Sequence, residues 1–157
     1  EINESVCHNS VTNRYKTKYD SIEILPCEKF RAVDIKTLPY PGFPTDMQAQ
    51  FMSLMSVADG TGVVVETVFE NRFMQVPELL RMGAKIKTDG RTAVIDGIKK
   101  LSGAKVKATD LRAGAALVIA ALAAQGETEI CNIDYIERGY ENFDKKLSSV
   151  GINIQKL

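Results

Sequence analysis

Two aspartates and three arginines occupy positions at which α/β proteins bind anions. Asp46 and Asp110 each follow a threonine at the start of a segment with helical periodicity, and Arg112 lies shortly after Asp110. The helix macrodipole is positive at that end, so a cation in the first turn costs roughly 0.3–1 kcal/mol. A helix N-terminus combined with a guanidinium group nevertheless suits a phosphate or a carboxylate. The pattern therefore indicates an anion site, although an exposed Arg112 paired with a nearby acid such as Asp110 explains it as well.

Arg72 and Arg138 each come after a predicted strand and before a predicted helix. Binding groups of α/β proteins gather at such strand ends. Taken singly, each arginine is also explained as a surface residue, and Asp46 and Asp110 are explained as helix-end aspartates that the macrodipole favours. Their recurrence in register changes this comparison, because the corresponding ends of two packed repeats can lie on one face. We expect an anion-binding face there.

One unit occurs twice in the chain. The pair Thr45-Asp46 returns as Thr109-Asp110, each time ahead of an apolar helix. A period of about 65 residues is too long for short solenoid repeats and favours duplicated α/β subdomains. The expected units cover about 21–86 and 91–157, with 1–20 as the tail of a preceding unit.

Hydrophobic periodicity and turn residues predict the elements of these units. A capping box of Thr45 and Gln48 opens the first helix, which has one apolar face that includes Met47. The valines at 63–65 predict a strand covered on both faces, and residues 4–20 predict a loop. The expected elements are strands over 21–25, 29–35, 63–65, 129–133 and 152–155, a hairpin over 84–96, helices over 45–58 and 77–82, and further helices that begin at 109 and at 139.

The composition is that of a soluble globular chain with 157 residues, 45% hydrophobic and 25% charged. Lys+Arg and Asp+Glu both number 20, which excludes the basic excess typical of nucleic-acid-binding proteins. The longest apolar run, 113–124, is too short to span a bilayer. We therefore expect neither a nucleic acid nor a membrane as partner.

The three cysteines, Cys7, Cys27 and Cys131, form no C-x-x-C pair. They indicate reduced thiols in the cytoplasm rather than a disulfide framework. The sequence has no paired-ligand metal spacing, so we expect neither a metal nor another cofactor, and no function for His8. The chain shows no signal peptide and begins with Glu1, which suggests a fragment.

Five motifs resemble the family of UDP-N-acetylglucosamine enolpyruvyl transferases, in order from about Val33 to Leu157. They are Pro-Gly-Phe-Pro-Thr-Asp-Met-Gln-Ala-Gln at 41–50, Thr-Val-Phe-Glu-Asn-Arg-Phe at 67–73, Leu-Ser-Gly-Ala at 101–104, Ala-Thr-Asp-Leu-Arg-Ala at 108–113 and Arg-Gly-Tyr-Glu at 138–141. The first two look like the amino-sugar branch rather than the enolpyruvylshikimate-phosphate synthase branch.

The resemblance implies an α/β enzyme of two lobes, each an inside-out α/β barrel of three βαβαββ-type units with helices inside and sheets outside. This chain then looks like part of the C-terminal lobe, with about two of its three units. The family reaction transfers the enolpyruvyl group of phosphoenolpyruvate to the 3-hydroxyl of UDP-N-acetylglucosamine and releases phosphate. It is the first committed step of peptidoglycan synthesis, so the resemblance also implies a bacterial, cytoplasmic enzyme.

The resemblance assigns catalytic roles to Asp46, Arg112 and Arg138. Asp46 is expected to hold the sugar hydroxyl and act as its general base, which requires a positioned carboxylate. Arg112 and Arg138 are expected to contact phosphoenolpyruvate or the charge that develops on it, which suits guanidinium groups. The expected substrate-binding residues are Asp46, Val68, Phe69, Arg72, Asp110 and Leu111.

The chain also departs from the family. The catalytic cysteine loop and the first lobe's lysine and arginine are absent, and none of the three cysteines lies in a matching motif. Tyr135 stands where many members have histidine, and residues 5–20 fit poorly. We therefore expect the chain alone to be inactive, with the first lobe of the same polypeptide as its partner and self-association through exposed sheet edges as a possibility. The alternatives are a non-catalytic nucleotide-sugar or anion-binding module and the enolpyruvylshikimate-phosphate branch.

Overall fold

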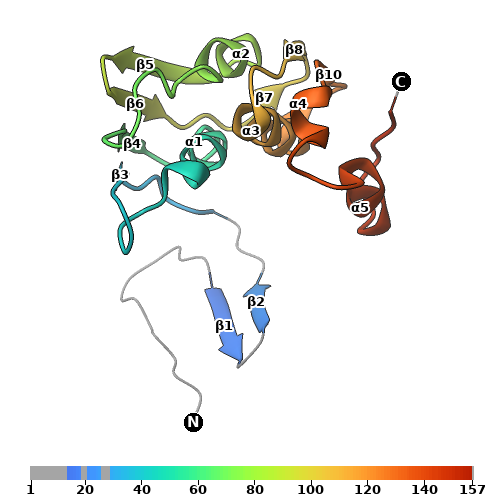
Figure 1. Ribbon diagram of the computed structural model, residues 1–157, viewed down its shortest axis with the longest axis horizontal. Coiled ribbons are helices and arrows are strands. Elements are labelled where there is room, and N and C mark those ends of the chain that lie inside the picture. Colours follow the sequence, from blue (N-terminus) through green and yellow to red (C-terminus); the bar gives the residue numbers. More distant parts are fainter. Residues whose placement is uncertain (1–13, 19–20, 26–28, 157) are drawn as a thin grey trace.

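The computed structural model describes residues 14–18, 21–25 and 29–156, with side chains from 29 onward. It is a mixed α/β arrangement in which helices pack against a sheet and against one another (Figure 1). The strands are β1 (Arg14–Lys18), β2 (Ser21–Leu25), β3 (Ile35–Lys36), β4 (Thr61–Val65), β5 (Lys85–Asp89), β6 (Thr92–Asp96), β7 (Leu101–Ser102), β8 (Lys105–Lys107), β9 (Ala124–Gln125) and β10 (Glu129–Cys131). The helices are the 3-10 turn η1 (Thr45–Met47), α1 (Gln48–Met55), α2 (Val76–Arg81), α3 (Leu111–Leu122), α4 (Asp134–Glu137) and α5 (Phe143–Ser149).

The larger sheet has four strands in the order β3-β4-β6-β5. β3 runs parallel to β4, while β4–β6 and β6–β5 are antiparallel. The β5–β6 connection is the predicted hairpin, in which Gly90 has a φ of 53° that suits glycine. The prediction of a strand covered on both faces at 63–65 is wrong, because Val64 is buried and its neighbours Val63 and Val65 are half-exposed. The sheet therefore has one face on the core.

Two further parallel pairs flank the second long helix. β7 pairs with β9 and β8 pairs with β10, each pair spanning α3 in the sequence. β3 and β4 span α1 in the same manner. Both long helices are therefore the crossovers of parallel β-α-β connections, in which the helix returns the chain to start a strand beside the first one.

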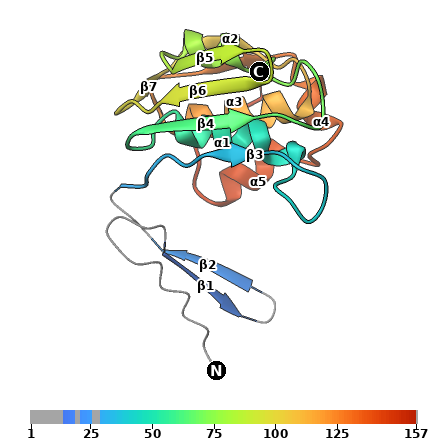
Figure 2. The ribbon, with the colours of Figure 1, turned by 90° about the vertical axis from the view of Figure 1, so that its left-hand side faces the viewer.

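The core lies between the sheet and the two long helices. Figures 1 and 2 show α1 and α3 on the same side of the four-stranded sheet. The helices contact each other directly, and the Ser53 hydroxyl of α1 donates to the Ala116 carbonyl of α3 at 2.7 Å. The largest fully buried apolar side chains in this core are Met52, Leu79, Met82, Ile95, Leu101 and Leu117.

The first predicted helix begins differently from the expectation. Residues 45–47 form a 3-10 turn before α1, and neither start has a side-chain cap. The capping box is wrong, because the Thr45 hydroxyl donates to Glu66 and Gln48 donates to the Met52 sulfur. Met47 is 43% exposed, so it does not belong to the buried face.

Three other predictions need correction. The predicted loop contains a strand at 14–18 that pairs with the confirmed strand at 21–25; tyrosine and threonine in Arg-Tyr-Lys-Thr-Lys favour this. The predicted strand at 29–35 is reduced to one isolated bridge at Arg31 before β3, and 152–155 pairs with no strand among the described residues. Residues 4–13 and 19–20 lie outside the described residues.

The region after β10 also differs from the prediction. The strand ends at Cys131 and a short helix, α4, follows it. The helix that was expected from Gly139 begins at Phe143, since Asn142 has a left-handed φ of 48° that interrupts helical geometry. The part of the predicted helix that follows Asn142 is present as α5.

Candidate functional site

Asp46 and Arg112, separated by 66 positions in the chain, meet in the structure. The Arg112 Nε donates to Asp46 Oδ1 at 2.5 Å. Their side chains are 65% and 31% exposed, so the pair lies at the surface with one charge partly covered. The η1 turn that carries Asp46 leads into α1, and Arg112 lies in the first turn of α3. The packing of the two crossover helices therefore brings together two of the three residues with predicted catalytic roles.

Asp110 caps α3 and does not pair with the Arg112 side chain. One Asp110 oxygen, Oδ1, accepts from the backbone N–H groups of Arg112 at 2.7 Å and Ala113 at 3.0 Å. With Asp110 at the N-cap, Arg112 is the second residue of the helix. The alternative explanation of Arg112 as the partner of an acid therefore holds, but the acid is Asp46 and not Asp110. The carboxylate of Asp110 supports the helix end that presents Arg112.

Leu111 and Arg138 lie in neighbouring parts of the site. A Cβ placed on Gly139 would lie 3.2 Å from the Leu111 Cδ1, so the turn that follows Arg138 passes directly over the start of α3. The Arg138 guanidinium lies 5.5 Å from the centre of the Tyr135 ring. This distance is within the range of a cation–π contact, so the Tyr135 ring and the Arg138 side chain support each other.

Residues 66–72 form the third part of the site. Val68 and Phe69 follow β4 and are 37% and 49% exposed. The Arg72 guanidinium lies over the Phe69 ring at 4.3 Å, within the range of a cation–π contact. Among the described residues, no hydrogen bond or ion pair joins Arg72 or Arg138 to Asp46. The structure thus joins Asp46 with Arg112 and Phe69 with Arg72.

Sequence reasoning missed Glu66, which is only 1% exposed. Its Oε1 accepts from the Thr37 hydroxyl and from the N–H groups of Val68 and Phe69, and its Oε2 accepts from the Thr45 hydroxyl. A charged residue at the end of an apolar strand was the available signal. Burial raises the pKa of Glu66, but the hydrogen bonds from Phe69, Thr45, Thr37 and Val68 outweigh it and hold the pKa below its usual value.

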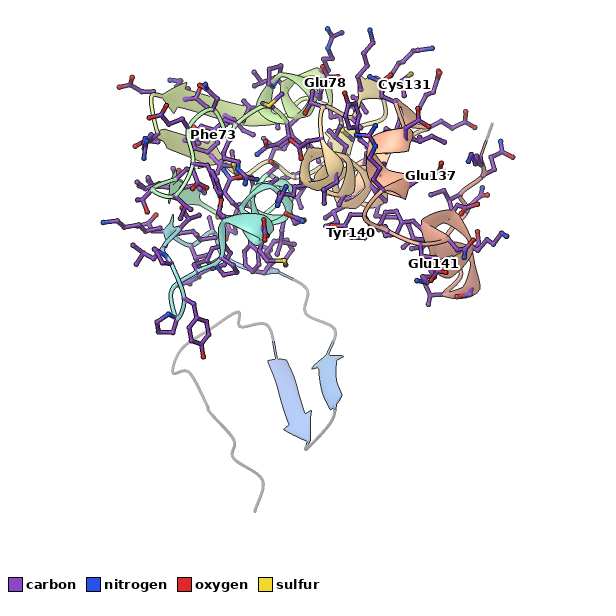
Figure 3. The ribbon with its side chains drawn as sticks, viewed as in Figure 1. Phe73, Glu78, Cys131, Glu137, Tyr140 and Glu141 are labelled. Atoms are coloured by element: carbon purple, nitrogen blue, oxygen red, sulfur yellow. The ribbon has the colours of Figure 1, made fainter. Side chains whose placement is uncertain are left out.

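Cys131 is half-buried with a free thiol, and it pairs through β10 with Lys107, whose N–H donates to Glu78. Figure 3 shows Cys131 and Glu78 at the same end of the molecule. Cys7 and Cys27 lie outside the described residues. Over the described ranges, no group of histidine, cysteine or acidic residues is arranged to hold a metal ion. No helix in the same ranges is long and apolar enough to cross a membrane.

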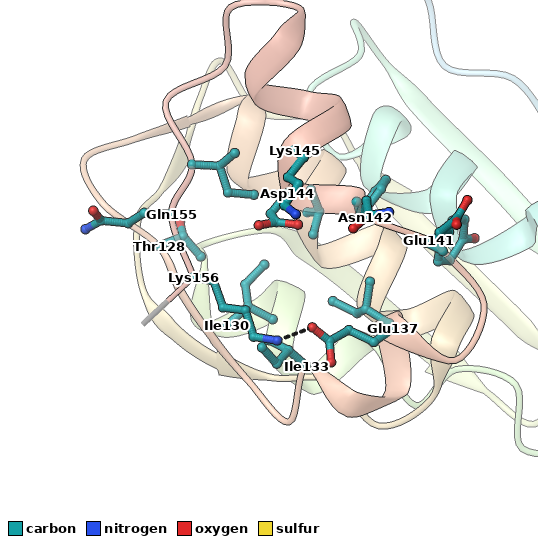
Figure 4. Close-up of a pocket in the computed structure, with 15 residues that line it drawn as sticks. Thr128, Ile130, Ile133, Glu137, Glu141, Asn142, Asp144, Lys145, Gln155 and Lys156 are labelled. Atoms are coloured by element: carbon teal, nitrogen blue, oxygen red, sulfur yellow. Dashed lines mark hydrogen bonds and ion pairs between the residues drawn. The ribbon is translucent and has the colours of Figure 1, made fainter.

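A separate cavity of about 550 Å³ lies between α4, α5 and the segment at 154–156. Figure 4 shows its rim, where Lys156 and Glu137 form an ion pair. Its apolar lining comes mainly from Val118, Ile130, Ile133, Ile136, Tyr140, Phe143 and Ile154. None of the predicted site residues lines this cavity, so it is distinct from the candidate site.

The sequence matches known proteins over most of its length. Residues 7–147 match the model of EPSP synthase (3-phosphoshikimate 1-carboxyvinyltransferase). A UDP-N-acetylglucosamine 1-carboxyvinyltransferase of Halothermothrix orenii is 56% identical over 142 residues, and one of Thermodesulfovibrio yellowstonii is 58% identical over 143. These alignments cover 90% and 91% of this chain but 34% of each relative. The chain thus spans about a third of the length of these curated relatives.

Solved structures show the same fold. The enolpyruvyl transferase NikO from Streptomyces tendae aligns with a TM-score of 0.83 and 31% identity, over 92% of this chain and 34% of that protein. An EPSP synthase from Acinetobacter baumannii aligns with a TM-score of 0.61 and 17% identity, over 85% of this chain and 30% of that protein, which shows the fold alone. The motif resemblance, the matched family model and these alignments agree: the chain belongs to the EPSP synthase family of enolpyruvyl transferases and is a homologue of the UDP-N-acetylglucosamine 1-carboxyvinyltransferases.

Proposed function

We propose that this chain forms part of the C-terminal lobe of an enzyme that transfers the enolpyruvyl group of phosphoenolpyruvate to the 3-hydroxyl of UDP-N-acetylglucosamine. The observation that carries the proposal is the contact between the Asp46 carboxylate and the Arg112 guanidinium at the adjoining starts of two helices. A carboxylate beside a guanidinium group provides a base for a hydroxyl proton and a cation for a phosphate ester. The reaction would supply a precursor of peptidoglycan in the cytoplasm.

The reaction needs a proton acceptor at the sugar hydroxyl. In the proposal, Asp46 accepts that proton as the hydroxyl oxygen bonds to the central carbon of phosphoenolpyruvate, and inorganic phosphate is the leaving group. Asp46 is 65% exposed at its side chain, so a substrate can reach it in this chain.

The arginines have the complementary task. Arg112 lies in the first turn of α3, where the backbone N–H groups add to its positive charge. Arg138 lies next to the same helix start through the Gly139–Leu111 contact. We assign to both arginines the phosphate and carboxylate groups of phosphoenolpyruvate and the charge that develops on them.

Val68, Phe69 and Arg72 supply the proposed nucleotide-sugar side of the site. The exposed Phe69 ring and the backbone beside it offer an apolar surface and polar main-chain groups, with Arg72 held over the ring. Asp110 acts on the same site by capping the helix that presents Leu111 and Arg112. The 56–58% identity to the amino-sugar enzymes, against 17% to an EPSP synthase structure, favours UDP-N-acetylglucosamine as the acceptor over shikimate phosphate.

The domain organisation is part of the proposal. We propose repeat units at about 21–86 and 91–157, which the β3-α1-β4 and β8-α3-β10 connections support because each places one long helix between two parallel strands. The chain spans about a third of its curated relatives, and we propose that the remaining two thirds supply the first lobe and the catalytic cysteine. On this basis the chain alone binds but does not turn over.

The test is a titration of the 157-residue chain with UDP-N-acetylglucosamine, followed through backbone amide NMR shifts. We expect weak saturable binding, with a dissociation constant on the order of 1 mM. The shifts should cluster at Asp46 and Val68 and be lost in Asp46→Ala. Arg81→Ala, an exposed arginine on α2, is the control and should bind as the wild type does. Addition of inorganic phosphate should shift the amides near Arg112, and Arg138→Ala should weaken that response.

No shifts at millimolar ligand would contradict a half-site preformed on this chain. Shifts confined to the separate cavity between α4 and α5 would contradict the residue assignment. A stronger response to shikimate 3-phosphate than to the nucleotide sugar would favour the other branch of the family.

A further inference from the structure

Glu66 connects two segments that the proposed function assigns to different tasks. It follows β4 directly, and its side chain is almost completely buried, with 1% of the residue exposed. A buried carboxylate is unfavourable unless its oxygens accept hydrogen bonds. Here the oxygens accept from two hydroxyls and two backbone N–H groups, and no arginine or lysine pairs with it among the described residues. The carboxylate is thus held entirely by neutral donors.

The first carboxylate oxygen organises the nucleotide-sugar segment. Oε1 accepts from the N–H groups of Val68 at 2.9 Å and Phe69 at 3.1 Å, so it fixes the turn by which the chain leaves the strand. The same oxygen accepts from the Thr37 hydroxyl at 2.9 Å. Thr37 in turn accepts from the N–H of Thr67 at 2.9 Å, and the Thr67 hydroxyl donates to the Thr37 carbonyl. Hydrogen bonds from both Glu66 and Thr37 therefore hold this turn in place.

The second carboxylate oxygen reaches the general-base segment. Oε2 accepts from the Thr45 hydroxyl at 2.8 Å. Thr45 begins the 3-10 turn that carries Asp46, and that turn has no side-chain cap of its own. The direction of the Asp46 side chain therefore depends on a threonine whose hydroxyl is committed to Glu66 rather than to the helix start.

We propose that Glu66 is a positioning residue for the transfer reaction, joining the segment that carries the general base to the segment that binds the nucleotide sugar. This inference rests on the proposed function. The two oxygens of this one carboxylate each bind a different segment, so the rigid carboxylate group fixes the distance between the two segments. Two contacts made by separate side chains would not fix that distance. Hydrogen bonds to a carboxylate are shorter and stronger than those between neutral groups, so they hold this distance more tightly.

Glu66→Gln and Thr45→Val test the two arms separately. Glu66→Gln keeps the size of the side chain but removes its charge and one acceptor oxygen. Thr45→Val keeps the shape of Thr45 and removes only the hydroxyl bound by Oε2, while Thr45→Ser keeps that hydroxyl and is the matched control. All variants are studied well below their unfolding temperatures, where a change in stability alone leaves ligand affinity unchanged.

The measurements are the backbone amide shifts of the free chain and its dissociation constant for UDP-N-acetylglucosamine. In Glu66→Gln, we expect the amide protons of Val68 and Phe69 to move upfield and the Asp46 amide to move with them. In Thr45→Val, the Asp46 amide should move while those of Val68 and Phe69 change little. Both variants should weaken binding about tenfold, because a displaced segment loses roughly one hydrogen bond to the ligand. Thr45→Ser should bind within about twofold of the wild type.

The outcomes separate this inference from the proposed function. If the wild type binds and both variants bind equally well, Glu66 is structural only and the inference is overturned while the proposed function stands. An Asp46 amide that responds to neither variant also overturns the inference, because no connection between the segments then exists. If the wild type itself does not bind, the preformed half-site fails, and the amide shifts of the free variants alone decide whether Glu66 connects the two segments.

Discussion

A functional and a structural role for the Asp46–Arg112 pair predict clearly different results when the two residues are substituted. We consider Asp46→Ala, Arg112→Ala and the double variant, which together form a double-mutant cycle. The pair joins the two crossover helices across 66 positions of sequence, with an Nε–Oδ1 distance of 2.5 Å. A short contact of this kind is readily taken as a structural connection between the helices. The exposures of the two side chains predict a different result.

The expected coupling energy is small. The side chains are 65% and 31% exposed, so water screens much of the attraction, and exposed pairs contribute about 0.2–1 kcal/mol. Arg112 also lies at a positive helix end, where a cation costs roughly 0.3–1 kcal/mol. The two effects nearly cancel, so Arg112→Ala should change the free energy of unfolding by less than about 1 kcal/mol. The coupling should fall further in 1 M salt, where the Debye length is about 3 Å.

The assay is urea unfolding of the four proteins, with thermal unfolding as a second measurement. For a chain of this size, 1 kcal/mol corresponds to about 2–4 °C in unfolding temperature. The matched control is the Lys105–Glu129 pair, which has a 2.7 Å contact and side chains that are 65% and 48% exposed, outside the candidate site. Both cycles should give coupling energies in the same range.

The functional measurement should differ strongly between the two cycles. Asp46→Ala should abolish the amide response to UDP-N-acetylglucosamine, whereas Lys105→Ala should leave it intact. A coupling energy above about 2 kcal/mol for Asp46 and Arg112, well beyond the range of exposed pairs, would refute this reasoning. It would mean that the pair holds the two helices together and that its position at the surface says little about substrate.

Three other predictions concern the support of the site. Asp110→Ala should destabilise the chain by about 1 kcal/mol in urea unfolding. Asp110→Asn should stay close to the wild type, because an amide oxygen can still cap α3, and equal losses in the two variants would contradict the capping role. Leu79→Ala, at a fully buried position, should cost about 2–5 kcal/mol, against about 0.5 kcal/mol or less for the exposed neighbour in Leu80→Ala; similar values would place Leu79 outside the core. The pKa of Glu66 lies below its usual 4.5, so its contribution to stability is complete above that pH and is lost as the pH falls through the folded-state pKa. Between pH 6 and pH 3, the free energy of unfolding should therefore fall less steeply in Glu66→Gln than in the wild type. Equal slopes in the two proteins would contradict this.

Local patterns in the sequence predicted the elements whose signals are local. A helix from 109 and the hairpin around Gly90 were both predicted, because helix-start and turn residues act within a few positions. The helix α3 begins at Leu111, and Asp110, predicted to lie in its first turn, is its N-cap. Proline in the first turn of α2 worked in the same way. The repeat in register also led us to expect a shared face, and the structure places Asp46 beside Arg112, while an anion-binding face that includes Arg72 and Arg138 stays a prediction.

Contacts between distant segments account for the errors. Thr45 and Gln48 fit a capping box, but the buried carboxylate of Glu66 offers Thr45 a stronger partner 21 positions away. The strand at 14–18 was missed because its lysine and arginine residues hide the alternation of tyrosine and threonine. The partner of Arg112 could not be read from sequence either, since Asp110 is nearer in the chain but turns its oxygen to the backbone.

The distance between the two charges of the site depends on how α1 and α3 are positioned along each other. Each charge of the Asp46–Arg112 pair is fixed to the start of a different helix, and the helices touch further along at Ser53 and Ala116. A larger side chain at Ala116, which is fully buried, would translate one helix along the other. The distance between carboxylate and guanidinium would then change although neither residue was altered. Substitutions deep in this interface can therefore change the separation of the two charged groups without touching either residue, through a shear movement of one helix along the other.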